Sequence, residues 1–91
     1  MQIKNQIKNT IVNYDKVRHI RIESNENQFD IVVKYAKDDE ESIGTYESYS
    51  RAQEILDEIT IEYKKVARVD EQGNRNPRFY TIPKVYYMPE K

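Results

Sequence analysis

The chain has 91 residues, of which 37 % are hydrophobic and 34 % charged, and it contains no cysteine. This length supports one domain with a thin core, and the lack of cysteine excludes disulfides, thiol catalysis and thiolate metal sites. Its 15 basic and 16 acidic side chains give a net charge of −1, too small for a global field that attracts nucleic acid or an anionic membrane. No apolar run approaches the roughly 18 residues that a membrane span needs. We therefore expect a cytoplasmic protein with no membrane partner.

Residues 2–9 repeat the letters QIKN, which places Ile3, Ile7 and Ile11 four residues apart. The repeat is consistent with a frayed amphipathic turn of helix or with a loose tail. Because short termini are seldom tied down, we favour a flexible N-terminal tail over residues 1–9.

Three short strands are expected before the middle of the chain. Residues 10–14 are rich in β-branched side chains, and residues 17–23 alternate, which turns His19 to the solvent side of a strand. Residues 29–35 alternate most clearly. The polar residues 24–27 between these two alternating runs predict a turn, and hence a hairpin.

A charged connection over residues 36–41 leads to another short run at residues 42–46. Gly44 lies in this run. A glycine inside a strand predicts a bulge, or a close approach of the helix that follows.

Residues 46–66 carry the clearest pattern in the chain, an apolar stripe at steps of three and four that predicts an amphipathic helix. The members of this stripe are Ala52, Ile55, Leu56, Ile59, Tyr63 and Val66. Ser48 is placed to cap the helix at its N-terminus, and Ser50 is a second candidate. The helix should end near residues 67–70, because residues 71–77 are a dense cluster of helix breakers.

The C-terminal segment is aromatic but interrupted by Pro77, Pro83 and Pro89. Proline cannot donate to a strand ladder, so the segment can be an edge strand or an extended arm but not a central strand. Its rings either cap their own core or lie on another chain, and the sequence leaves both arrangements open.

These elements predict an α+β fold, with an antiparallel meander of three to four short strands packed against one amphipathic helix and an extended or edge-strand tail. We expect a β-β-β-α domain over residues 10–70, and a loop with an aromatic C-terminal extension over residues 71–91.

Residues 43–48 (IGTYES) and 51–59 (RAQEILDEI) resemble a segment of small uncharacterised proteins from Gram-positive bacteria and their phages. In those proteins a meander of short strands precedes a helix that opens with Y-x-S-x-x-R-A. The resemblance covers roughly residues 10–65. It implies an α+β domain in a phage or mobile-element setting and brings no catalytic residue or cofactor.

We nominate no catalytic, cofactor-binding or metal-binding residues. His19 is the only histidine, and with Gly44 and Gly73 as the only glycines there is no glycine-rich phosphate loop. The carboxylates of residues 38–41 lack the spacing of a calcium loop, so we expect a solvated loop there. The acidic helix residues Glu54, Asp57, Glu58 and Glu62 are expected to form an ordinary solvated face, with nucleic-acid mimicry as the less favoured alternative. The sequence thus argues against an enzyme.

The sequence is compatible with two functions. The first is a non-catalytic interaction protein that binds a host or viral protein and can self-associate, because apolar and aromatic side chains exceed what a thin core needs. Its candidate contact residues are Ile61, Phe79, Tyr80, Tyr86 and Tyr87. The alternative is single-stranded nucleic-acid binding, with bases stacked on the tail rings and phosphates contacted by Arg75, Arg78 and Lys84.

Overall fold

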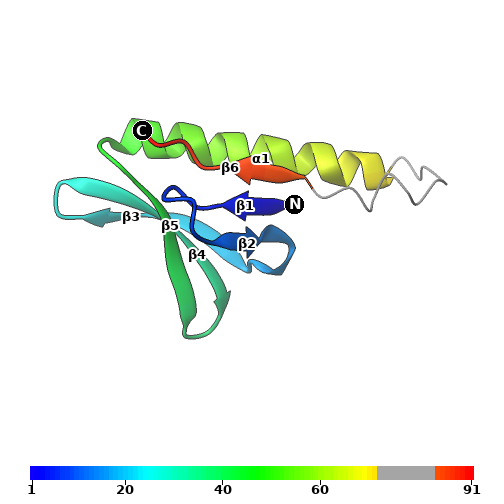
Figure 1. Cartoon of the computed structure of the whole chain (residues 1–91), viewed down its shortest axis with the longest axis horizontal. Coiled ribbons are helices and arrows are strands. Elements are labelled where there is room, and N and C mark those ends of the chain that lie inside the picture. The colour runs from blue at the N-terminus through cyan, green and yellow to red at the C-terminus, as the bar shows by residue number, and fades with distance from the viewer. Residues whose placement is uncertain (72–83) are drawn as a thin grey trace.

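This computed structural model describes the backbone of residues 1–71 and 84–91, and the side chains of residues 1–65 and 84–91. Its elements, in chain order, are the strands β1 (Gln2–Lys4) and β2 (Ile11–Asn13), the short 3-10 helix η1 (Tyr14–Lys16), the strands β3 (His19–Asn25), β4 (Gln28–Ala36) and β5 (Asp39–Tyr46), the helix α1 (Tyr49–Glu71) and the strand β6 (Val85–Tyr87). The described residues form two three-stranded sheets, mostly antiparallel, beside one α-helix (Figure 1). The predicted α+β fold class is confirmed.

Strands β3, β4 and β5 form the predicted antiparallel meander. Ile20 pairs with Val33 and Ile22 with Ile31, so the alternating runs bring their apolar residues to one face. Strand β4 runs to Ala36 and β5 begins at Asp39 rather than at residue 42, so the loop expected over residues 36–41 is confined to residues 37–38. The charged residues at the start of β5 are compatible with a strand, because a strand with one solvent-facing side can carry charged side chains there.

The predicted bulge lies next to Gly44. Ile31 pairs with Gly44 and Val32 with Ser42, which leaves Ile43 as the extra residue of β5. The bulge turns the Ile43 side chain into the core, where only 2 % of it is exposed.

Gly44 is also a point of close packing, although the neighbours are not those expected. A Cβ atom at this position would lie 2.8 Å from Cε2 and Oη of Tyr46 and 3.1 Å from Cε of Met88. The space that a side chain would need is thus filled by a buried ring and by the C-terminal segment rather than by α1.

The helix α1 confirms the predicted stripe. Ala52, Ile55 and Ile59 are fully buried, whereas Leu56 and Tyr63 are partly buried. The Ser48 Oγ accepts from the Arg51 backbone N–H at 3.1 Å, as expected of an N-cap. The stripe residue Val66 lies outside the described side chains, and the helix extends to Glu71, one residue past its expected end.

Residues 2–4 are not a tail. They form β1, the central strand of the order β2-β1-β6, and Ile3 has no exposed surface. Ile3 pairs with Val12 on one side and with Tyr86 on the other. The expectation of a loose N-terminus over residues 1–9 is therefore wrong, because β6 reaches back from the far end of the chain to complete the sheet.

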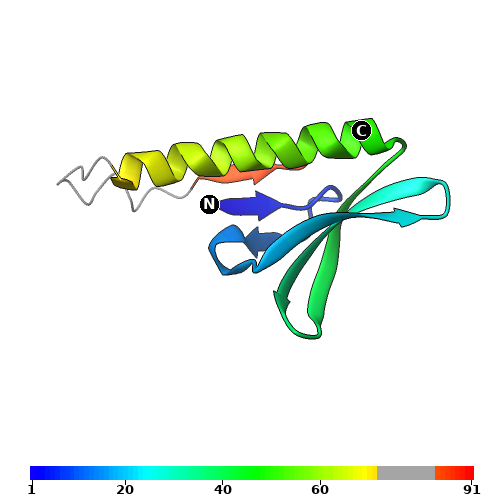
Figure 2. The ribbon, with the colours of Figure 1, turned by 180° about the vertical axis from the view of Figure 1, so that it is seen from behind.

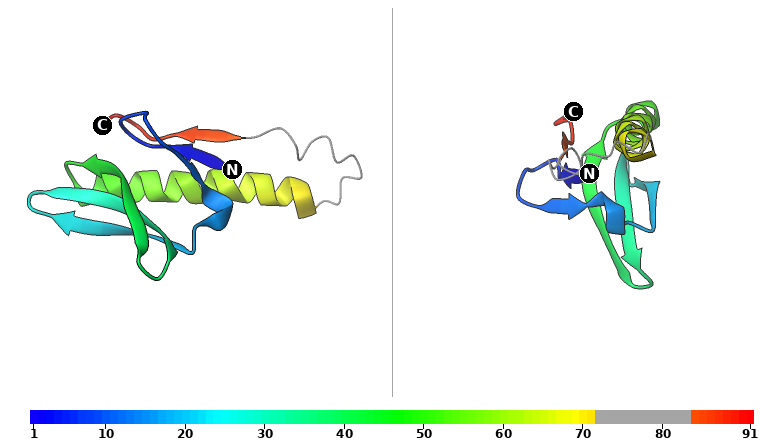
Figure 3. Two further views of the ribbon diagram at one scale, coloured as in Figure 1. Left: turned by 60° about the horizontal axis from the view of Figure 1, so that its bottom comes forward. Right: turned by 90° about the vertical axis from the view of Figure 1, so that its right-hand side faces the viewer.

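The pairing of β1 with β6 is parallel, and Figures 1 and 2 show both strands lying along α1. Strand β6 is an edge strand, which agrees with the expected edge-strand tail. Seen along α1, the small sheet lies on one side of the molecule and the meander on the other (Figure 3). The core fills the space between the two sheets and the helix. Its members are Met1, Ile3, Val12, Ile31, Val33, Ile43, Tyr46, Ala52, Ile55, Ile59, Tyr86 and Met88.

Gln6 joins the two ends of the chain to the meander. Its backbone N–H donates to the Ile43 carbonyl at 2.9 Å, and its side-chain Oε1 accepts from the Thr45 N–H at 2.7 Å. The Gln6 Nε2 donates to the carbonyls of Thr45 and Glu90. A side-chain amide thus takes the place of a strand on the free edge of β5, satisfying backbone groups that would otherwise need another partner.

Candidate interaction surface

The β2-β1-β6 sheet has one buried and one open face, because successive side chains in a strand point to opposite sides. Ile3, Val12 and Tyr86 point into the core. The other residues of the three strands face away from it. We call them the outer face: Gln2, Lys4, Ile11, Asn13, Val85 and Tyr87.

One row of the outer face is apolar at both ends. Lys4 pairs with Ile11 on β2 and with Tyr87 on β6, so the three side chains lie in register. Ile11 is 55 % exposed and Tyr87 61 %. With neighbouring strands about 4.8 Å apart, Ile11 and Tyr87 stand roughly 10 Å apart with Lys4 between them. Two large apolar groups thus flank one cation on a flat strand surface.

The ammonium group of Lys4 is available for a new contact. Among the described residues its side chain makes no ion pair, and it is partly exposed. The register places Lys4 between two apolar neighbours, and lysine can pack its alkyl stem against such groups while its charge stays in water.

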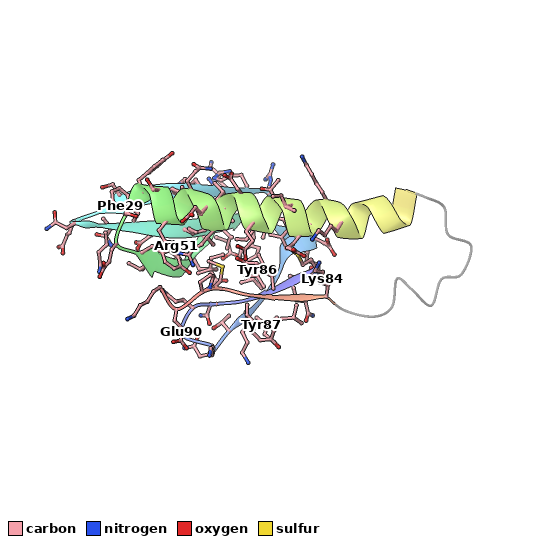
Figure 4. The ribbon with its side chains drawn as sticks, turned by 90° about the horizontal axis from the view of Figure 1, so that it is seen from above. Phe29, Arg51, Lys84, Tyr86, Tyr87 and Glu90 are labelled. Atoms are coloured by element: carbon pink, nitrogen blue, oxygen red, sulfur yellow. The ribbon has the colours of Figure 1, made fainter. Side chains whose placement is uncertain are left out.

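Tyr86 and Tyr87 have opposite environments, as Figure 4 shows on the two sides of β6. Only 7 % of Tyr86 is exposed, and its Oη donates to Glu58 Oε1 at 2.7 Å. Burial and this hydrogen bond raise the pKa of Tyr86. Because β1 fixes the register of β6, the Tyr86 ring is turned towards α1 and is not exposed for the partner contact expected of it. Tyr87, the next residue, faces outward and is 61 % exposed.

Lys84, proposed from the sequence as a phosphate contact, is already paired. Its Nζ bonds Glu62 Oε2, and Lys65 also reaches Glu62, at 3.2 Å. Hydrogen bonds from Lys84 and Lys65 hold the pKa of Glu62 below its usual range. Ile61, 54 % exposed on α1, is accessible as expected but belongs to the helix and not to the outer face. The remaining candidates, Arg75, Arg78, Phe79 and Tyr80, lie outside the described residues.

The sequence does not identify Ile11 and Lys4 as members of an exposed face. Ile11 lies in a predicted strand, but so short a strand shows too little alternation to reveal which side faces outward. The face of Ile11 follows from its pairing with Lys4 and from the burial of Val12, the next residue, in the core. A further apolar side chain, Ile7, is 72 % exposed in the loop between β1 and β2.

Groups that could carry chemistry are dispersed. His19 is exposed, and its Nε2 lies 3.3 Å from the Arg21 guanidinium. The acidic run is engaged within the meander, where Glu41 accepts from the Tyr35 hydroxyl at 2.6 Å and Glu40 bonds Arg21. In the part of the chain that the structure describes, no three histidine or acidic residues are grouped as a metal site.

The acidic side of α1 is also partly used inside the molecule, through the bonds of Glu58 to Tyr86 and of Glu62 to Lys84. These internal contacts reduce the number of carboxylates that could imitate a row of phosphates. Within the described residues, no helix has the length and apolar character needed to cross a membrane.

Comparisons with protein-family models, with curated proteins and with solved structures give no match for this chain.

Proposed function

We propose that the chain is a non-catalytic interaction protein that binds another protein through the outer face. The observation that supports this proposal is the row of Ile11, Lys4 and Tyr87, with Ile11 55 % and Tyr87 61 % exposed on the same side of one sheet. Aromatic residues are enriched at the energetic centres of protein interfaces, and clustered apolar exposure is typical of binding surfaces.

The chemistry of this row indicates which groups a complementary partner surface would present. Ile11 and Tyr87 would bury apolar surface, and Lys4 would need an acceptor once water is removed. A matching surface therefore presents a carboxylate surrounded by apolar groups. The resemblance to proteins of phages and mobile elements makes a host or viral protein the natural source of such a surface, and that assignment is part of the proposal.

The alternative of nucleic-acid binding gains no support from the described members of its contact set. Lys84 is paired with Glu62, and the ring of Tyr86 is buried against α1. Neither side chain is free to contact a base or a phosphate without breaking a contact of the fold. We therefore propose no second function.

The test compares capture by three forms of the protein. Wild type, the double variant Ile11→Ser/Tyr87→Ser and the control Ile61→Ser are immobilised and exposed to a host cell lysate, and bound proteins are quantified by mass spectrometry. Both sites are exposed, so each single substitution should change the free energy of unfolding by only about 0.5 kcal/mol. The proposal expects a protein bound by wild type and Ile61→Ser and lost from the double variant.

A purified partner identified in this way should also bind Lys4→Glu more weakly, because the substitution places like charges opposite each other. Equal capture by all three forms would refute the proposed surface. Concentration-dependent dimers in sedimentation, abolished by the double variant, would identify a second copy of the chain as the occupant and overturn the assignment of a different protein.

A further inference from the structure

A cluster of basic side chains lies at one end of the meander, on the sheet that does not carry the outer face. Arg18, His19, Lys34 and Lys37 line an open hollow of about 450 Å³. His19 on β3 and Lys34 on β4 are paired in register, and the Arg18 N–H donates to the Lys34 carbonyl at 2.7 Å. Lys37 lies in the turn between β4 and β5. Backbone pairing thus brings the four side chains together.

Glu40, the residue of β5 that pairs with Lys34, is bonded to a different cation. Arg21 donates to both oxygens of Glu40, at 3.2 and 3.0 Å, and to Glu23 at 2.7 Å. The hydrogen bond from Arg21 is the main reason that the pKa of Glu40 is lowered, with weaker contributions from Lys34 and His19. Arg21 therefore competes with Lys34 and His19 for the carboxylate of Glu40.

Within the described part of the chain, the lining cations form no ion pairs of their own, and Glu40, which lies across the strands from Lys34, is bonded to Arg21. Among the described residues, the side chains of Arg18, Lys34 and Lys37 form no ion pair. Asp38 and Asp39 follow Lys37 in the chain but do not line the hollow. Positive groups held together by strand pairing repel one another, and a bound anion would remove that repulsion.

We propose that this hollow binds a phosphate dianion, either free or as the terminal group of a small molecule. A phosphate carries close to two negative charges and three strong acceptor oxygens, which match the three cations and the imidazole that line the site. Arginine can offer two parallel donors to such a group, and lysine a compact positive charge. The site is independent of the outer face and of the function proposed for it.

The test is a titration of the isotopically labelled protein with inorganic phosphate, followed by amide chemical shifts at low ionic strength. Sodium chloride at equal ionic strength is the reference, because exposed charges respond to screening alone. We expect saturable shifts confined to residues around Arg18, His19, Lys34 and Lys37. Shifts that do not saturate, or that chloride reproduces, would overturn the proposal.

Two charge-matched double variants locate the binding. Lys34→Gln/Lys37→Gln removes two cations of the hollow, whereas Lys64→Gln/Lys91→Gln removes two exposed cations elsewhere. Loss of charged hydrogen bonds should weaken phosphate binding by about tenfold or more in the first variant and leave it unchanged in the second. Equal weakening in both would show a net-charge effect and contradict the site.

Two further ligands separate the sources of the phosphate. Adenosine monophosphate binding at the same residues, at least as tightly as inorganic phosphate, would support a phosphorylated small molecule. Inorganic phosphate binding alone would support the free anion. If a short oligothymidylate bound while both small ligands left the shifts unchanged, the site would be a contact for a nucleic-acid strand and the proposal would be wrong.

Discussion

The two QIKN repeats contain a direct test of the small sheet, because one isoleucine is buried and the other is not. Ile3 has no exposed surface in the central strand β1, whereas Ile7 is 72 % exposed in the following loop. Ile3→Ala and Ile7→Ala remove the same atoms from the same local sequence. They should therefore differ only through packing.

The expected difference is large for a domain of this size. Replacing a fully buried isoleucine with alanine costs about 2–5 kcal/mol, because apolar transfer energy is lost and a cavity remains. A chain of this length has a total stability of roughly 5–14 kcal/mol, so Ile3→Ala removes a substantial part of it. The exposed Ile7→Ala should stay within about 0.5 kcal/mol of wild type.

Urea unfolding followed by circular dichroism measures both values. A loss of about 3 kcal/mol in Ile3→Ala should also lower the melting temperature by roughly 12–24 °C. If the two variants unfold at the same urea concentration, β1 does not belong to the core and the placement of the small sheet is wrong.

Three further substitutions test other parts of the fold. Gly44→Ala should lower the free energy of unfolding by about 1–3 kcal/mol in urea melts, because its Cβ would lie 2.8 Å from the Tyr46 ring; a neutral result would contradict the close packing there. Glu26 has a left-handed φ of 56°, so Glu26→Gly should raise the free energy of unfolding by about 0.5–1 kcal/mol. A melting temperature below that of wild type would refute the turn geometry. Burial raises the pKa of Tyr46 from 10.0 to about 12, so its contribution to stability is complete below pH 10 and is lost as the pH rises through 12. Tyr46→Phe should reduce the alkaline loss of stability seen in urea melts across that range, and an unchanged pH dependence would count against burial of the hydroxyl.

The meander and the helix could be predicted because their signals are local. The alternation through Phe29, Ile31, Val33 and Tyr35 repeats often enough to identify a buried face, and the turn before it links it to β3. The stripe of α1 spans several helical turns, and Ser48 marks its start. Each pattern is complete within one stretch of the sequence and does not depend on distant residues.

The assembly of the small sheet around β1 could not be predicted, because its signals are not local. β1, β2 and β6 have three residues each, too few to show a period, and β1 is stabilised by β6 at the far end of the chain. The exposed residues of the candidate site could not be predicted for the same reason, because they depend on pairing between distant parts of the chain. Only the register of Ile3 against Tyr86 decides that Tyr86 is buried and Tyr87 exposed, and adjacent tyrosines carry no sequence signal that distinguishes them. The role of Gln6 at the edge of β5 likewise depends on a contact distant in sequence.

The most direct test of the proposed function is photo-crosslinking in host cells from the position of Tyr87, replaced by a photoreactive phenylalanine, with the same substitution at Ile61 as the matched control. The outer face should yield a discrete adduct with a different protein from the position of Tyr87 and none from that of Ile61. Adducts from the position of Ile61 alone, or no adduct from that of Tyr87 in a correctly folded protein, would contradict the outer face as the site of interaction.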